Sequence, residues 1–247
     1  MKRMLIVLTA ALLLVRTPGA FAQTVDEVIE KSLAAQGGRA ALGKITSRTM
    51  TGAIVLQTPG AEIAGTIEAY NKTPNKSRSV IKMDLTQFGA GPVAIDQRFD
   101  GTSAYVIDPL QGNRDISGNQ LDNMKNGSFP SAFLDYKDRG ITVALLPGQK
   151  LAGRDMFVVE MKPKTGSAVK SYIDAETFLI ARSVVTVNVP QLGADVENTV
   201  DFSDYRAVDG VKVPFVTKLA SSVQNYTVTV SKVEHNTNID DKMFSKP

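Results

Sequence analysis

The side chains most often used in catalysis and metal binding are scarce in this chain of 247 residues. It contains no cysteine and a single histidine, His235. Disulfide bonds, thiolate metal sites and cysteine nucleophiles are therefore excluded. Because zinc takes three or four His, Cys or carboxylate ligands, a lone histidine also disfavours a zinc site. A serine triad would have to use His235, which we interpret as a solvated or capping residue near a strand end.

Acidic residues are the remaining candidates for chemistry. Asp96 and Asp100 lie close together in the sequence, as do Asp240 and Asp241. Neither pair belongs to a loop with the alternating oxygen ligands of a calcium site, and acids beside turn glycines usually stabilise the turn. The G-x-S-x-G, P-loop, G-x-G-x-x-G and H-E-x-x-H motifs are absent from the sequence. We therefore predict no enzymatic activity, no catalytic residue, no metal and no cofactor.

Residues 1–22 have the three parts of a secretory signal peptide. Two cations at positions 2 and 3 precede an apolar run over residues 4–15, and Ala20-Phe21-Ala22 supplies the cleavage pattern. The alternative is an N-terminal anchor, but the apolar run is shorter than the roughly 20 residues of a membrane-spanning helix. We predict cleavage after Ala22 and export of a single mature domain, residues 23–247.

The formal net charge of the chain comes from the predicted signal peptide. The full sequence carries 28 Lys and Arg against 25 Asp and Glu, a formal net charge of +3. Removal of Lys2, Arg3 and Arg16 leaves as many cations as acids, so the mature protein is formally neutral. A neutral protein has no bulk electrostatic attraction for nucleic acid, and we predict no nucleic-acid partner.

Two parts of the mature chain have helical spacing. Thr24 and Glu27 form a capping box before apolar residues at helical intervals, and Gly37-Gly38 ends this helix. A short further turn is expected over residues 39–42. The second helical stretch lies between Pro109 and Gly140, where Pro130 suits the first turn of a helix.

The rest of the chain alternates between apolar and polar residues with a period of two, which is typical of strands. Gly, Pro and Asn separate the runs at intervals of about ten to fifteen residues, which predicts eleven to thirteen strands in an antiparallel meander. Because open sheets of more than about ten strands tend to curl, the hollow of the sheet needs a cover. We predict a mainly β (α+β) fold, a single long antiparallel sheet curled into a half-open barrel with helices as lid. A closed barrel filled by its own side chains is the alternative.

Alternation also assigns residues to the inner face of the sheet. We expect the ligand-binding face of the hollow to consist of Met50, Ile54, Ile63, Ile67, Ile81, Met83, Val200, Phe202, Val213, Phe215, Tyr226 and Val228. The lid is expected to comprise residues 24–36 and 121–136, with apolar side chains of Val28, Ile29, Leu33, Leu121, Met124, Phe133 and Leu134. For each of these residues, plain core packing is the alternative interpretation.

Five stretches of the sequence share the pattern of a known protein family. The strongest is Phe-Ser-Asp-Tyr-Arg-Ala-Val-Asp-Gly-Val-Lys-Val-Pro at residues 202–214, and the others are residues 25–29 with 36–42, 99–109, 172–177 and 239–247. Over nearly the whole mature chain they resemble the periplasmic outer-membrane lipoprotein-sorting proteins of the LolA/LolB/LppX-type superfamily. These are strand and turn signatures of a divergent, LolA-like branch, and they specify a fold better than an activity.

The resemblance implies a half-open β-barrel with a helical lid, located in the periplasm. It implies a carrier or chaperone that holds a lipid or the acyl chains of a lipoprotein in an apolar cavity, with a role in lipoprotein sorting. Envelope membrane proteins are further candidate partners, and we expect a monomer. The alternative from another class is a periplasmic scaffold or interaction module whose β core is filled by its own side chains.

Overall fold

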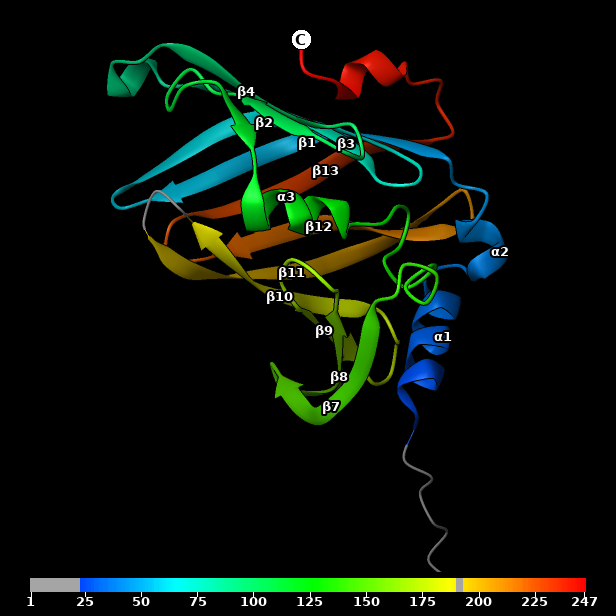
Figure 1. Ribbon diagram of the computed structural model, residues 1–247. Helices are drawn as coiled ribbons and strands as arrows, with labels where there is room; N and C mark the ends of the chain where they lie inside the picture. The colour runs from blue at the N-terminus through cyan, green and yellow to red at the C-terminus, as the bar shows by residue number, and fades with distance from the viewer. Residues whose placement is uncertain (1–22, 190–192) are drawn as a thin grey trace, which may run out of the picture.

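The computed structural model describes residues 23–189 and 193–247 (Figure 1). The predicted signal peptide lies outside the described residues, and its cleavage stays a prediction. In the part of the chain that is described, two helices precede the sheet and a third lies in mid-chain.

The first helix begins at the predicted capping box. In α1 (Val25–Ala35), the side chain of Thr24 accepts a hydrogen bond from the backbone nitrogen of Glu27 at 3.2 Å. The backbone nitrogen of Thr24 in turn donates to Glu27 Oε2 at 2.8 Å. Two backbone donors at the helix end are satisfied in this way. The predicted further turn is also confirmed, as α2 (Arg39–Leu42).

Thirteen strands form one antiparallel sheet within the described residues. Two short 3-10 helices, η1 (Thr86–Phe88) and η3 (Asp241–Phe244), lie outside it. The strands are β1 (Ser47–Thr58), β2 (Ala61–Lys72), β3 (Lys76–Asp84), β4 (Pro92–Phe99), β5 (Ala104–Ile107), β6 (Arg114–Ile116), β7 (Thr142–Leu151), β8 (Arg154–Lys162), β9 (Val169–Asp174), β10 (Ile180–Val189), β11 (Ala194–Val208), β12 (Val211–Ala220) and β13 (Asn225–His235).

The strand order confirms the predicted fold class and adds a long-range pairing. From one edge to the other the order is β6-β5-β4-β3-β2-β1-β13-β12-β11-β10-β9-β8-β7. The first and last strands thus pair in the middle of the sheet. The edge strands β6 and β7 follow one another in sequence but do not pair, so the curled sheet stays open. The segment between them, which contains α3 (Gly118–Lys125), crosses the hollow (Figure 1).

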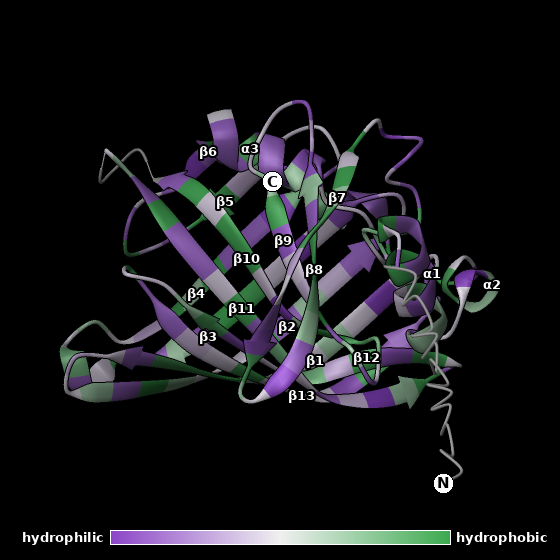
Figure 2. Cartoon of the chain, turned by 90° about the horizontal axis from the view of Figure 1, so that it is seen from below, coloured by the Kyte–Doolittle hydropathy of each residue, from purple (hydrophilic) through white to green (hydrophobic). Residues whose placement is uncertain are grey.

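The two faces of the sheet differ in polarity, as the alternation predicts. Figure 2 shows hydrophilic and hydrophobic residues alternating along the strands. On the inner face, Ile54 lies opposite Gly65 of β2 and Val228 of β13, and Ile67 lies opposite Ile81. The largest apolar cluster joins this face to α1 and to the segment after α3; it includes Val28, Ile29, Leu33, Phe129, Phe133, Tyr136, Val159, Ile173, Val213 and Phe215.

The outer face carries ion pairs. Asp96 accepts hydrogen bonds from Arg78 and Arg98, with the closest nitrogen–oxygen distances both 2.8 Å. Burial alone would raise the pKa of Asp96, but the two arginines outweigh it and hold this pKa below its usual value. Arg98 and Lys72 also donate to backbone carbonyls of the C-terminal segment, which Figure 1 shows on the side of the sheet away from α3. The C-terminal segment is thus held on the outer face by these bonds and by the burial of its own Ile239 and Phe244.

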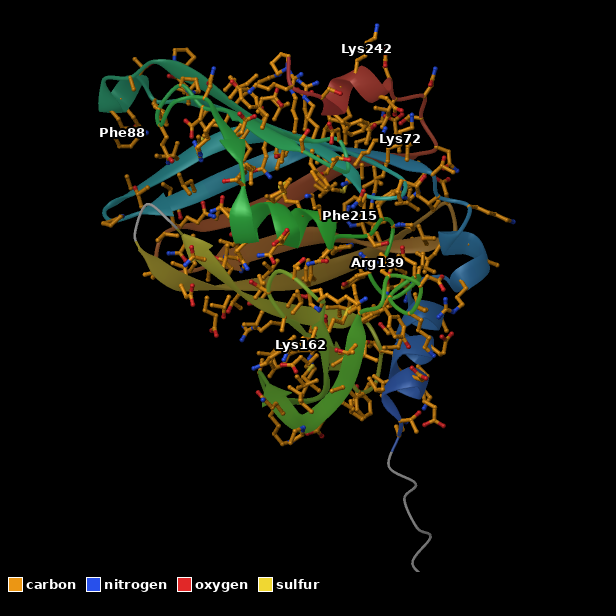
Figure 3. All side chains as sticks on the ribbon, viewed as in Figure 1. Lys72, Phe88, Arg139, Lys162, Phe215 and Lys242 are labelled. Atoms are coloured by element: carbon orange, nitrogen blue, oxygen red, sulfur yellow. The ribbon has the colours of Figure 1, made fainter. Side chains whose placement is uncertain are left out.

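The helical prediction after Pro109 is only partly correct. Residues 118–125 form α3, but the stretch around Phe133 and Leu134 consists of successive turns. Arg139, labelled in Figure 3, donates to the carbonyl oxygens of Asn126 and Gly127 at 2.6 and 3.0 Å. These bonds and the burial of the aromatic side chains hold the turns, so tertiary packing overrides the local helical spacing.

A glycine on the inner face allows β2 to approach β3. A Cβ atom on Gly65 would lie 2.4 Å from the carbonyl oxygen of Lys82. We therefore expect Gly65→Ala to lower the free energy of unfolding by about 1–3 kcal/mol, measured by urea denaturation. The neighbouring Ala64 is exposed, and Ala64→Ser adds one heavy atom there as a matched control with little expected effect. Equal stabilities of the two variants would contradict the close approach.

Candidate functional site

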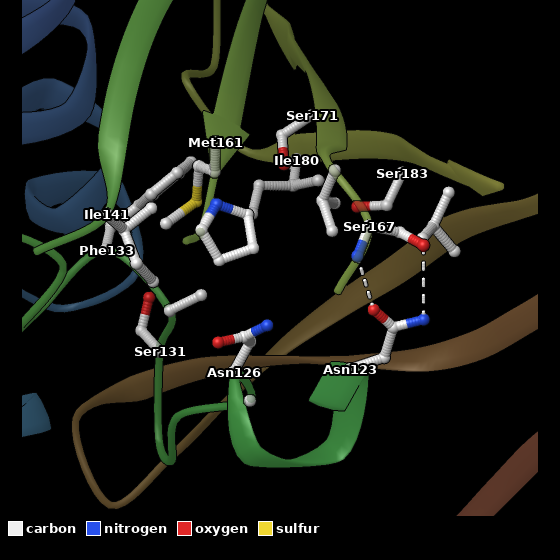
Figure 4. A pocket seen from close by; sticks show the side chains of 15 residues that line it. Asn123, Asn126, Ser131, Phe133, Ile141, Met161, Ser167, Ser171, Ile180 and Ser183 are labelled. Carbon is white, nitrogen blue, oxygen red and sulfur yellow. Dashed lines mark hydrogen bonds between the residues drawn. The ribbon is translucent and has the colours of Figure 1, made fainter. Parts of the chain in front are cut away.

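A cavity of about 310 Å³ lies between α3 with its following loop and the inner faces of β8, β9 and β10 (Figure 4). One wall is apolar and includes Phe133, Ile141, Met161, Val169, Ile180 and Val185. The polar lining residues are Asn123, Asn126, Ser131, Ser167, Ser171 and Ser183. None of the described lining residues carries a charge. This composition is typical of small-molecule sites, which are mainly apolar with a few placed polar groups.

Helix α3 covers one side of this cavity and is attached through polar groups. Asn123 accepts a hydrogen bond from the backbone nitrogen of Ser167 at 2.7 Å and donates to Ser167 Oγ at 3.3 Å. Asn126, just after the helix, donates to the carbonyl oxygen of Thr165 at 2.6 Å. No residue of α3 is buried, and its apolar residues Leu121 and Met124 are half-buried. The helix is therefore held chiefly by hydrogen bonds to the β8–β9 connection.

The second covering unit is apolar and well packed. In α1, Val28, Ile29 and Leu33 are fully buried, and they belong to the same cluster as Phe133 and Tyr136. Tyr136 Oη donates to Asp26 Oδ1 at 2.5 Å, and this bond lowers the pKa of the Asp26 carboxyl. Leu134 is partly buried against the cluster, and Arg39 Nη1 donates to its carbonyl oxygen at 3.0 Å. The two stretches predicted as lid thus differ in how they are attached.

Arg48, at the start of β1, has no carboxylate partner within the described part of the chain. The guanidinium of Arg48 lies over the ring of Phe129, with Cζ 4.8 Å from the centroid. Its Nε is buried and has no hydrogen-bond partner among the described residues. Burial lowers the pKa of Arg48 to about 10. The cation therefore relies on the aromatic face for stabilisation.

His235 lies opposite Arg48 in the ladder between β1 and β13. Its side chain is only 1% exposed, and Nδ1 lies 3.2 Å from Asp209 Oδ2. Burial and then the charge of Arg48 lower its pKa, and together they outweigh the opposing carboxylate. The expected solvated or capping histidine is instead a buried side chain that favours the neutral form.

The twelve predicted cavity residues share the inner face, at varying depth. Ile54, Met83, Val213 and Phe215 are buried. The other eight, namely Met50, Ile63, Ile67, Ile81, Val200, Phe202, Tyr226 and Val228, are half-buried. None of the twelve lines the 310 Å³ cavity. Val200 of β11 pairs with Ser183 of β10, which does line it. Contact of the twelve with a ligand stays a prediction.

Sequence reasoning missed Arg48 and the cavity-lining serines. The serines have a visible signal, since Ser171 stands at an inward position between Val169 and Ile173 in an otherwise apolar strand face. Arg48 has no such signal, because its burial depends on Phe129, which is distant in sequence.

Two general features are also clear. Across residues 23–189 and 193–247, His, Asp and Glu side chains form no group of three that could hold a metal ion. In the same residues, no helix has both the length and the apolar character needed to span a membrane.

Solved structures with the same fold are similar to nearly the whole chain. A LolA superfamily protein from Nitrosomonas europaea is 16% identical, with 91% of this chain and 99% of that chain covered at a TM-score of 0.58. A DUF1329 family protein from Desulfovibrio piger is 15% identical, with 91% and 98% covered at a TM-score of 0.57. A domain described as an outer membrane lipoprotein-sorting protein, from Vibrio parahaemolyticus, is 15% identical, with 88% and 94% covered at a TM-score of 0.54.

No family model matches the sequence, and no curated protein matches it. The structural matches nevertheless confirm the predicted resemblance at the level of fold: the chain has a LolA-like fold.

The lowered pKa of His235 predicts a pH dependence of stability. Unfolding restores the ordinary pKa of 6.5, so the unfolded chain binds more protons than the folded chain just below that pH. The contribution of His235 is therefore complete above pH 6.5 and is lost as the pH falls through its folded pKa. Urea denaturation between about pH 5 and 8 should show this decline, and His235→Gln should remove it.

The matched variant Asp209→Asn removes the opposing carboxylate. It should lower the pKa of His235 further, so the decline still begins near pH 6.5 but continues to lower pH and becomes larger. A wild-type stability that stays constant over this range, or an identical slope in His235→Gln, would contradict the assignment.

Proposed function

We propose that the protein is an exported, non-enzymatic carrier that binds one acyl chain or acylated molecule in the hollow of its sheet. The observation that carries the proposal is the uncharged cavity of about 310 Å³ beneath α3. This volume lies at the lower end of the range for small-molecule sites, which suits a single chain. Each buried methylene contributes about 0.8 kcal/mol, so about ten methylenes supply on the order of 8 kcal/mol before ordering costs.

The wider inner face supports a carrier rather than a closed core. Eight of the twelve predicted cavity residues are only half-buried, although they are apolar and face the covered side of the sheet. The cavity wall is continuous with the inner face of the next two strands. Ser183 of β10 pairs with Val200 of β11, and Val200 pairs with Leu219 of β12. A longer acyl chain would extend from the cavity along this row.

The lid of the carrier is α3 rather than α1. Polar contacts with the β8–β9 connection hold α3, whereas α1 shares the main apolar cluster. Regions with few buried apolar contacts open at the lowest free-energy cost. In the carrier, α3 opens for ligand exchange while α1 and the segment around Phe133 stay packed.

The proposed cellular role rests on the predicted export signal and on the fold. A mature protein released after Ala22 in the bacterial envelope would meet acylated molecules in the periplasm, where envelope membrane proteins would deliver or receive the ligand. The candidate process is lipoprotein sorting, the process given in the description of the similar Vibrio parahaemolyticus domain. The competing function is a scaffold whose core is self-filled, favoured by the extensive buried cluster around Phe133 and Phe215.

A charge on the cavity wall should abolish binding. Val185 lines the cavity, and the next residue, Thr186, is exposed on the outer face. We expect Val185→Asp to weaken binding of the apolar probe N-phenyl-1-naphthylamine at least tenfold, about 1.4 kcal/mol, because an unpaired buried charge is costly. Thr186→Asp is the matched control and should bind normally, with circular dichroism reporting the fold of both variants.

The same titration tests the wider face. Phe202→Asp should weaken binding of the probe if the ligand extends along the twelve predicted residues. The neighbouring residue Ser203 is exposed, so Ser203→Asp is the matched control and should bind normally. A mature protein that releases no acylated species into organic solvent and does not bind the probe favours the scaffold.

Locking α3 should slow ligand exchange. The natural chain has no cysteine, so Asn123→Cys with Ser167→Cys introduces one defined pair at side chains that touch. We expect probe displacement in stopped-flow fluorescence to be at least tenfold slower in the oxidised double variant than after reduction. The reduced variant should exchange at least as fast as the natural chain, because the hydrogen bonds of Asn123 are lost. Asn123→Cys alone is the control, and an unchanged rate in a protein with the disulfide formed would contradict the lid.

A further inference from the structure

Ser171 and Ser183 form a pair of unused hydroxyl groups on the cavity wall. They are opposed residues of β9 and β10, and both line the cavity (Figure 4). Ser171 is 5% exposed. Among the described residues, neither hydroxyl has a hydrogen-bond partner, whereas Asn123, Asn126 and Ser167 are bonded to one another or to the backbone.

Unused hydroxyls in this setting point to a polar group on the ligand. The hydroxyls lie among Met161, Ile180 and Val185, so they cannot be satisfied by these neighbours. Ser183 is half-buried and both hydroxyls face the cavity, so water bonds to them in the free protein. A ligand that displaces this water must replace its hydrogen bonds, and a hydroxyl both donates and accepts. A ligand group that offers an acceptor, a donor or both would satisfy them.

The charge of that ligand group is limited by the lining. The described lining residues include no Lys, Arg, His, Asp or Glu, so a carboxylate, phosphate or ammonium inside the cavity would have no counter-ion. Burying an unpaired charge is far more costly than burying a neutral polar group that is hydrogen-bonded. Alcohols and esters therefore fit the cavity, whereas ionised lipids do not.

We propose that the cavity selects an electrically neutral amphiphile, whose ester or hydroxyl group bonds to Ser171 and Ser183 while its acyl chain lies against Met161, Ile180 and Val185. This inference rests on the proposed carrier function and specifies its ligand class. The two serines form the polar subsite and the apolar wall holds the chain.

The experiment compares ligands of equal chain length that differ only in the polar end. The delipidated mature protein is loaded with N-phenyl-1-naphthylamine, and 1-hexadecanol, palmitate and hexadecylamine are titrated as competitors. We expect 1-hexadecanol to displace the probe at concentrations at least tenfold lower than either ionised ligand. 1-Monopalmitoylglycerol, which carries both an ester and hydroxyls, should compete at least as well as the alcohol.

Serine variants test the subsite itself. Ser171→Ala with Ser183→Ala should weaken binding of 1-hexadecanol at least fivefold relative to binding of the probe, which carries neither a hydroxyl nor an ester. The control Thr186→Val removes a hydroxyl from the exposed outer face of β10 and should change neither value. The melting temperature of the ligand-free serine variant should not fall, because these hydroxyls have no protein partner among the described residues.

Each outcome decides between the proposals. Palmitate or hexadecylamine competing as well as the alcohol overturns neutral selection, and an undiminished affinity of the double variant for the alcohol overturns the serine subsite. In both cases probe binding leaves the carrier function standing. A protein that binds neither the probe nor any of the competitors overturns the carrier function as well.

Discussion

The whole structure depends on an antiparallel sheet that curls without closing. The edge strands β6 and β7 are adjacent in sequence yet stand at opposite ends of the strand order. The sheet therefore presents one concave, apolar face, and this face must be covered by something other than more sheet. The chain supplies the cover from its own connections: α1 before the first strand, and the segment with α3 between the two edges. The cavity exists because the second of these covers does not fill the hollow.

The outer face makes the curled sheet compatible with water. Asp96 with Arg78 and Arg98 places a partly buried carboxylate between two cations, where neither sign is left unpaired. Such a group contributes to stability only while all its members remain, because removing one leaves a buried charge. The C-terminal segment lies over this polar surface through Lys72 and Arg98 and leaves the apolar face to the covers from the other parts of the chain.

Local patterns predicted much of this arrangement, and long-range contacts account for the rest. The capping box at Thr24 and the alternation around Ile54 depend on neighbouring residues, so the sequence reveals them directly. The pairing of β1 with β13 joins Met50 to Val233 and carries no local signal. The turns around Phe133 have helical spacing but are held by Arg139 and by burial. For the site, alternation identified the inner face, but the position of the cavity depends on where α3 crosses it. Ser171 and Ser183 lie together because β9 and β10 pair, which the sequence pattern implies only once the register is known.

The energetics of the two covers differ in the way that the proposed carrier function requires. Displacing α1 would expose Leu33 and Phe133, which are 0% and 1% exposed, and each large apolar side chain contributes about 1.5–3 kcal/mol when buried. Displacing α3 breaks a few hydrogen bonds to the β8–β9 connection, each worth about 1 kcal/mol because water replaces the lost partner. In the proposed carrier, the apolar cover thus maintains the fold while the polar cover moves. A ligand that fills the cavity adds apolar contacts beneath α3 and thereby favours the closed state, so the affinity and the closure of the lid are coupled.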